Sequence, residues 1–238
     1  MHQLVGYHRP TSIADAVGLL ERPNRMALAG GTTIFHDGGG NPVELVDLQS
    51  LGLSGISATG SHVEIGATAT LQALVDSDLV PNLIRNAAKA DQPSTLRGLA
   101  TVGGSVGAAD GESVLVAALL VHEATVVFAD ERSVALEEVL ADGLSPGDLI
   151  VRFSVVPGGA TAMAATGRTP RDVPIVAAAG RVGPHGTRLA LCGVGPVPQL
   201  VTEVSLGQLD PPGDFRGTAA YRMHLAEVLT ARVLGELS

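Results

Sequence analysis

The chain has 238 residues, of which 45% are hydrophobic and only 3% aromatic, with no tryptophan. This length is enough to bury a core in more than one lobe. The formal net charge of −9 argues against binding to nucleic acid or to an anionic membrane surface.

The cysteine count and the apolar segments exclude further classes of protein. A single cysteine, Cys192, can form neither an internal disulfide nor an iron–sulfur site, which needs several thiolates. We expect it to be a buried, inert thiol. No signal peptide is visible in residues 1–20, no apolar run is long enough to span a bilayer, and the histidines are not spaced as a helical metal pair. We therefore expect a cytoplasmic protein without membrane insertion.

The first fifty residues predict a small β-α-β unit. Residues 11–21 have the pattern of an amphipathic helix, capped by Ser12 with Asp15 three residues later. Strands are expected at residues 25–29 and 45–48.

A second region extends from about residue 60 to Pro157, where a Pro-Gly-Gly sequence marks a boundary. Its apolar patterns predict strands at 63–67, 125–129 and 149–156, and helices at 70–76, 79–90 and 113–122, with a loop at 91–99. The third region predicts strands at 175–182 and 188–194, a loop at 201–215 and a terminal helix at 217–237. The predicted face of that helix comprises Tyr221, Leu225, Val228, Leu229 and Arg232.

Two glycine pairs flanked by hydroxyl residues are the main candidates for ligand binding. Leu28–Thr33 follows a predicted strand, and Thr101–Ser105 lies about seventy residues further on. Glycine permits positive φ, so that successive N–H groups converge into an anion-binding nest, and the missing side chains let a phosphate approach the backbone. One such loop alone is more often a tight turn, but two together favour a pyrophosphate site. Neither matches the G-x-G-x-x-G or P-loop pattern, which argues against a Rossmann site and a Walker-type ATPase.

Several further motifs occur in a fixed order along the chain. They are Tyr7–Ser12, Leu28–Thr32, Leu45–Leu48, Ile65–Ala67, Arg97 with Ala100–Ser105, Gly147–Ile150, Asp214–Gly217 and Tyr221–Arg222. In their residues and spacing, the chain resembles the medium, FAD-binding subunit of the xanthine dehydrogenase and carbon monoxide dehydrogenase family of molybdenum hydroxylases. The resemblance covers nearly the whole length.

The resemblance implies an α+β protein with a two-lobed PCMH-type FAD-binding fold. The first lobe is expected at residues 1–58, the second at 59–157, and a shortened C-terminal α+β domain at 158–238. FAD is expected between the first two lobes, with the third lobe closing over the flavin.

The resemblance also implies the residues of the FAD site. The pyrophosphate and ribityl region would be wrapped by the two glycine motifs, Asp110 would lie in the loop after the second, and two apolar residues would approach the isoalloxazine or adenine. The expected FAD-binding residues are Ala29, Gly30, Gly31, Thr32, Thr33, Thr101, Val102, Gly103, Gly104, Ser105, Asp110, Leu149 and Ile150.

In the resembled family, molybdopterin and [2Fe-2S] clusters are on partner subunits, so the large molybdopterin subunit and the small iron–sulfur subunit are the expected partners, in a dimer of heterotrimers. The flavin would pass electrons to an external acceptor. The sequence departs from the family at Val114, where an Asp is frequent, at Ala165, where a Lys is frequent before Arg168, and at Gly98 in place of Asn. His36 follows the first motif, but we expect a surface histidine there rather than a covalent flavin link.

Two alternatives remain open from the sequence. One is a stand-alone flavin oxidase of the vanillyl-alcohol oxidase type, which would need a larger substrate-capping domain than residues 158–238 provide. The other is a non-enzymatic scaffold subunit that has lost FAD, which Val114 and Ala165 motivate.

Overall fold

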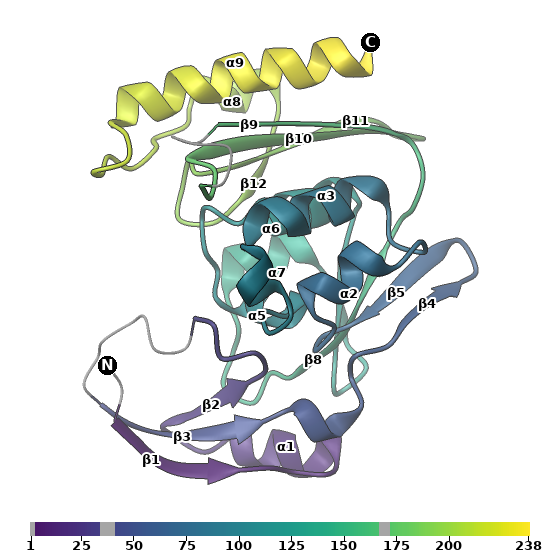
Figure 1. Cartoon of the computed structure of the whole chain (residues 1–238), viewed down its shortest axis with the longest axis vertical. Helices are drawn as coiled ribbons and strands as arrows, with labels where there is room; N and C mark the ends of the chain where they lie inside the picture. The colour runs from purple at the N-terminus through teal and green to yellow at the C-terminus, as the bar shows by residue number, and fades with distance from the viewer. Residues whose placement is uncertain (1–2, 34–40, 167–171) are drawn as a thin grey trace.

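Three β-sheets organise the molecule, and Figure 1 shows them one after another from the N-terminal to the C-terminal part of the chain. The computed structural model describes residues 3–33, 41–166 and 172–238. Runs of helices and runs of strands follow one another along the chain instead of alternating one by one. The fold is therefore α+β, as the sequence predicts.

The first sheet is parallel and has the strand order β1-β3-β2. Its elements are β1 (Gln3–His8), α1 (Ile13–Leu20), β2 (Arg25–Leu28) and β3 (Pro42–Asp47). Ser12 caps α1, because its side-chain oxygen accepts a hydrogen bond from the Asp15 amide at 3.1 Å. Helix α1 packs Ala16 and Leu20 against Val46 of the central strand. The predicted helix and strands are confirmed, and β1 was not predicted.

The second sheet is antiparallel and has the order β4-β5-β8-β6-β7. Its strands are β4 (Ile56–Thr59), β5 (His62–Gly66), β6 (Thr125–Phe128), β7 (Ser133–Ala135) and β8 (Ile150–Val155). The helices of this part are η1 (Gln49–Leu51), α2 (Leu71–Asp76), α3 (Asn82–Asp91), α4 (Ser94–Arg97), α5 (Val102–Gly107), α6 (Val114–Val121) and α7 (Leu136–Asp142). Two segments predicted as loops, 91–99 and the second glycine motif, therefore contain short helices.

The third sheet is antiparallel, with the order β12-β11-β10-β9. Its elements are β9 (Ala160–Thr166), β10 (Val176–Gly183), β11 (Gly186–Cys192), β12 (Gln199–Val201), α8 (Glu203–Leu206) and α9 (Ala219–Leu237). The two predicted strands and the terminal helix are confirmed, and the predicted loop at 201–215 contains the short helix α8.

Helix α6 is buried on every side because it lies between the second and third sheets. Its eight residues are all apolar and all buried. They share one core with Phe153 of β8 and with Ala177 and Ala179 of β10. The neighbouring residues of β10, Val176 and Ala178, point to the other face of the sheet, where they pack against α9. Figure 1 shows this layering of α9, third sheet and helices α3 and α6.

The buried face of α9 differs from the predicted one. Arg222, Ala226, Leu229 and Val233 are buried, whereas Tyr221 is 44% exposed. The face is turned by about one residue, or roughly 100° around the helix. The reason is that Arg222 is held inside by an ion-pair network, so an arginine occupies a position that periodicity assigns to an apolar residue. None of the helices in the described part of the chain has both the length and the apolar character of a membrane span.

Candidate functional site

A cleft of about 800 Å³ opens between the first sheet and the helices of the second region. One wall is the edge strand β2 with the loop that follows it, and the other is α5 with residues 144–150. A volume of this size suits a large organic cofactor, since such sites measure about 300–1,000 Å³. Within the described residues, no part of the chain after residue 157 lines the cleft. The third sheet covers α6, so the expectation that the third lobe closes over the flavin gains no support from the described lining of the cleft and stays a prediction.

The structure brings most of the sequence-predicted site residues together in this cleft. Two of them do not line it: Val102 is fully buried in the core, and Ser105 lies in α5 outside the lining. The predicted residues that do line the cleft are Ala29, Gly30, Gly31, Thr32, Thr33, Thr101, Gly103, Gly104, Asp110, Leu149 and Ile150.

The glycines of the first motif serve two physical purposes. A Cβ atom on Gly30 would lie 1.8 Å from the carbonyl oxygen of Leu99, so only glycine lets this loop touch the segment that leads into the second motif. Gly31 has a φ of +68°, a conformation that favours glycine. Together they turn the chain after β2 and let the first motif touch the segment that precedes the second.

The amides of the first motif are available to a ligand. No described residue accepts a hydrogen bond from the backbone N–H of Gly30, Gly31 or Thr32, and all three residues line the cleft. Successive free N–H groups are the donors that bind a phosphate without a lysine. The first motif therefore keeps unpaired the donors that the predicted nest requires.

The second motif is built differently from the predicted nest. Thr101 is the N-cap of α5 and accepts a hydrogen bond from the Gly104 amide at 3.1 Å, while the Gly103 amide donates to the carbonyl oxygen of Ala67 at 2.8 Å. These amides are therefore already satisfied, and the prediction of a second nest is wrong. A Cβ on Gly103 would lie 2.8 Å from the same Ala67 oxygen. The second motif thus forms a side-chain-free wall rather than a set of donors.

Arg25 is a cleft residue that the sequence analysis missed. Its side chain is only 9% exposed, and its Nε donates to Glu44 Oε2 at 2.7 Å. Its Nη1 is buried and has no hydrogen-bond partner. A buried donor without a partner is costly, so this atom is suited to an acceptor of a bound ligand. The signal in the sequence was a single charged residue at the start of a short apolar strand, which periodicity alone does not mark.

Asp110 lies in the turn between α5 and α6, at the edge of the cleft. Its Oδ1 accepts a hydrogen bond from the Glu112 amide at 3.0 Å. No described residue donates to its second carboxylate oxygen, so that oxygen can accept from a ligand hydroxyl. On the opposite wall, Asp148 is held by an ion pair with Arg132.

The positions that depart from the family pattern lie away from the cleft. Val114 is fully buried in the first turn of α6, and Ala165 is exposed on β9. Arg97 donates to Gln72 Oε1 at 3.2 Å and does not line the cleft. His36 and Arg168, which the sequence analysis considered, lie outside the described residues.

Two further expectations from the sequence concern the Cys192 thiol and metal binding. Cys192 is fully buried, and burial raises the pKa of its thiol to about 12, which confirms an inert thiol. Among the residues that the structure describes, no cluster of His, Cys, Asp and Glu is arranged to hold a metal ion.

The fold is α+β, with a cleft of cofactor size between the first sheet and the helices of the second region. The chain belongs to the family described as the FAD binding domain in molybdopterin dehydrogenase, whose model matches residues 3–157. This is a family of oxidoreductase subunits, and the family expected from the sequence is confirmed.

Individual relatives agree with the family. The chain is 28% identical to the uncharacterized protein YgfM of Escherichia coli (strain K12), across 94% of this chain and 93% of that protein. It is 40% identical over 115 residues to the carbon monoxide dehydrogenase medium chain of Afipia carboxidovorans, covering 44% of this chain and 39% of that one. Among solved structures it resembles a chain of the cyanide-inactivated Cu,Mo-CO dehydrogenase, with a TM-score of 0.88, 26% identity, and coverage of 100% and 98%.

Proposed function

We propose that the chain binds FAD non-covalently in the cleft between its first two lobes and serves as the electron-transfer subunit of a molybdenum-dependent hydroxylase. The observation that carries this proposal is the pairing of two glycine motifs across one cleft. One motif presents free amides, and the other presents a wall without side chains.

The first motif would hold the pyrophosphate. The amides of Gly30, Gly31 and Thr32 are unpaired, and the hydroxyl groups of Thr32 and Thr33 add further donors at the same end of the cleft. Backbone donors fit the acidic character of the chain, since they bind an anion without adding side-chain charge.

The opposite wall would hold the sugar and ring portions. Gly103 and Gly104 leave room for close approach, and Leu149 and Ile150 offer apolar surface to a flat ring. Asp110 would accept a hydrogen bond from a ribityl or ribose hydroxyl, and Nη1 of Arg25 would donate to an acceptor of the ligand.

FAD, when bound, would supply the exchange between one-electron and two-electron carriers. The residues of this chain would bind and orient it and keep water from its buried faces. We assign no catalytic side chain, because the substrate would be hydroxylated at molybdopterin on a large partner subunit. Electrons would pass through [2Fe-2S] clusters of a small partner subunit to FAD and then to an external acceptor.

The remaining organisation follows from the same proposal. We propose lobes at residues 1–58 and 59–157, a C-terminal domain at 158–238, and a dimer of heterotrimers in the cytoplasm. The three separate sheets support a division into three parts, and the second sheet already begins with β4 at Ile56, just before the first proposed boundary.

The proposal is tested by purifying the full chain with the subunits that copurify with it and recording the visible spectrum. Flavin absorbance is expected, and acid precipitation of the protein should release the flavin into solution as FAD. A colourless complex with no released FAD would contradict the proposal and favour the scaffold alternative. Substrate oxidation by the chain without its partners would favour the stand-alone oxidase instead.

A further inference from the structure

A network of charged side chains around the buried Arg222 joins the C-terminal domain to the edge of the cleft. Arg222 of α9 is 1% exposed, and its Nη2 donates to Glu112 Oε1 at 3.0 Å and to Asp214 Oδ2 at 2.8 Å. Arg216 forms an ion pair with the other carboxylate oxygen of Glu112. Two arginines and two carboxylates thus balance in charge, and the Arg222 hydrogen bond holds the pKa of Asp214 below its usual value.

Glu112 belongs to the turn that carries Asp110. The Glu112 amide donates to Asp110 Oδ1, and the Ser113 amide donates to the Asp110 carbonyl oxygen at 3.1 Å. The side chain of Glu112 therefore faces the C-terminal domain, while its backbone fixes the carboxylate of Asp110 at the cleft.

A second contact holds the same turn from its other side. The Gly193 amide donates to the Gly111 carbonyl oxygen at 2.6 Å. A Cβ on Gly111 would lie 2.2 Å from the Gly195 carbonyl oxygen, so the turn is pressed against the loop after β11. Arg222 Nη1 donates to the carbonyl oxygen of Gly193 at 2.9 Å, which links this loop to the ion-pair network.

We infer that Glu112, held by Arg216 and Arg222, is a positioning residue for the FAD site that acts through Asp110. This inference rests on the proposed function. The C-terminal domain lines no described part of the cleft, yet it fixes Asp110, whose second carboxylate oxygen receives no hydrogen bond from any described residue. Affinity for FAD then depends on an ion pair outside the cleft, since a hydrogen-bond acceptor contributes most when its position is set before binding.

The structure offers a matched control for this ion pair. Arg181 of β10 is also 1% exposed and also joins the C-terminal domain to the second region, because its Nη1 donates to Glu123 Oε1 at 2.7 Å. Glu123 follows α6 at the end opposite to Glu112, and neither Arg181 nor Glu123 lines the cleft. The Arg222–Glu112 and Arg181–Glu123 pairs are alike in chemistry and burial, and Glu112 differs in its second ion pair, with Arg216, and in its connection to Asp110.

The test compares Glu112→Gln with Glu123→Gln in the full chain with its copurifying subunits. Both variants should lower the melting temperature, because each weakens an ion pair with a buried arginine. Only Glu112→Gln should raise the Kd for FAD, by about tenfold, because only there does a charged hydrogen bond position a ligand contact. Asp110→Asn should raise the Kd by about the same factor, and adding Glu112→Gln to Asp110→Asn should raise it no further.

Three results would overturn the inference. They are an unchanged Kd in Glu112→Gln, an equal rise in both glutamate variants, and factors that multiply in the double variant. A wild-type chain with no saturable FAD binding would instead contradict the proposed function, and the inference with it. Wild-type binding with any of the three results contradicts the inference alone.

Discussion

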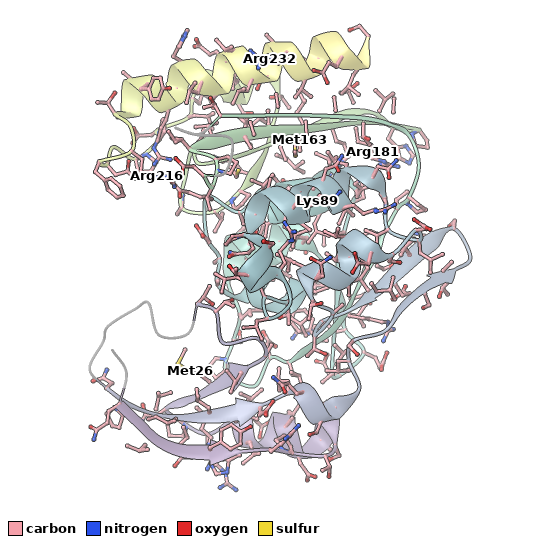
Figure 2. The ribbon with its side chains drawn as sticks, viewed as in Figure 1. Met26, Lys89, Met163, Arg181, Arg216 and Arg232 are labelled. Atoms are coloured by element: carbon pink, nitrogen blue, oxygen red, sulfur yellow. The ribbon has the colours of Figure 1, made fainter. Side chains whose placement is uncertain are left out.

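At the scale of single residues, the site depends on where side chains are missing. Gly30 lets the first motif touch the Leu99 carbonyl, and Gly103 lets α5 pack on the Ala67 carbonyl. Figure 2 shows Met26 of β2 on the side of the strand that faces the middle of the molecule, and Met26 lines the cleft. The site is therefore made from backbone approach and a few polar groups rather than from a cluster of reactive side chains.

Gly30→Ala should weaken FAD binding by at least about tenfold. The added Cβ would lie 1.8 Å from the Leu99 oxygen, so one of the two loops must move and carry its free amides with it. The Kd for FAD, measured by titration, checks this.

Gly18→Ala is the control, because an added Cβ there meets no atom within 4 Å in the exposed side of α1. It should leave the Kd unchanged and raise the free energy of unfolding by about 0.5–1 kcal/mol, since alanine favours a helix over glycine. Equal FAD affinity in the two variants would show that close approach of the motifs does not matter.

His122 should make stability depend on pH. Burial lowers the pKa of its imidazole to about 4 from an ordinary value of 6.5, although the hydrogen bond between Nδ1 and the Val156 carbonyl opposes this. Between these two values the unfolded state binds more protons than the folded state. Stability is therefore fully present above about pH 6.5 and falls as the pH is lowered to about 4, by about 3 kcal/mol.

Urea unfolding of wild type and His122→Gln at pH 7, 5.5 and 4.5 measures this effect. The difference between the two proteins in the free energy of unfolding should shrink as the pH falls, because only wild type carries the buried imidazole. A difference that is constant across these pH values would show that the lowered pKa of His122 is not the cause of the pH dependence.

At the scale of elements, the sequence predicts helix α6 well but does not predict which elements pack around it. An unbroken apolar run of eight residues predicts a buried helix, but it does not say that two different sheets cover it. The three-residue edge strands β7 and β12 carry few alternating residues and were missed, and the longer edge strands β1 and β9 were missed as well. The buried Arg222 displaced the predicted face of α9, because an arginine in an ion-pair network has no periodic signature.

Leu119→Ala should lower the free energy of unfolding by about 3 kcal/mol. Leu119 is fully buried in the core that α6 shares with both sheets, so truncation leaves a cavity that neither sheet can fill alone. Leu79→Ala, at a position that is 47% exposed, should change stability by no more than about 0.5 kcal/mol. Chemical denaturation of the two variants measures their free energies of unfolding. Similar decreases in both would mean that α6 is not the central layer of the core.

At the scale of the whole molecule, the order and spacing of the motifs along the chain predicted the family, which no single motif could do. The two glycine motifs were found from the sequence, but not their different physical roles, because hydrogen bonding of the second motif depends on Ala67, more than thirty residues away. The position of the third sheet against α6 also required the structure. Two arginines labelled in Figure 2 show how differently the C-terminal domain uses such residues. Arg216 forms an ion pair with Glu112 in the turn beside the cleft, whereas Arg232 lies on the exposed side of α9.

The most direct test of the central claim is an experimental density map of the full chain with its copurifying subunits and FAD. We expect one FAD per chain in the cleft, with the pyrophosphate within hydrogen-bond distance of the Gly30, Gly31 and Thr32 amides and the Gly103–Gly104 wall on its other side. Density for FAD at another surface of the chain, or an empty cleft at saturating FAD, would contradict it.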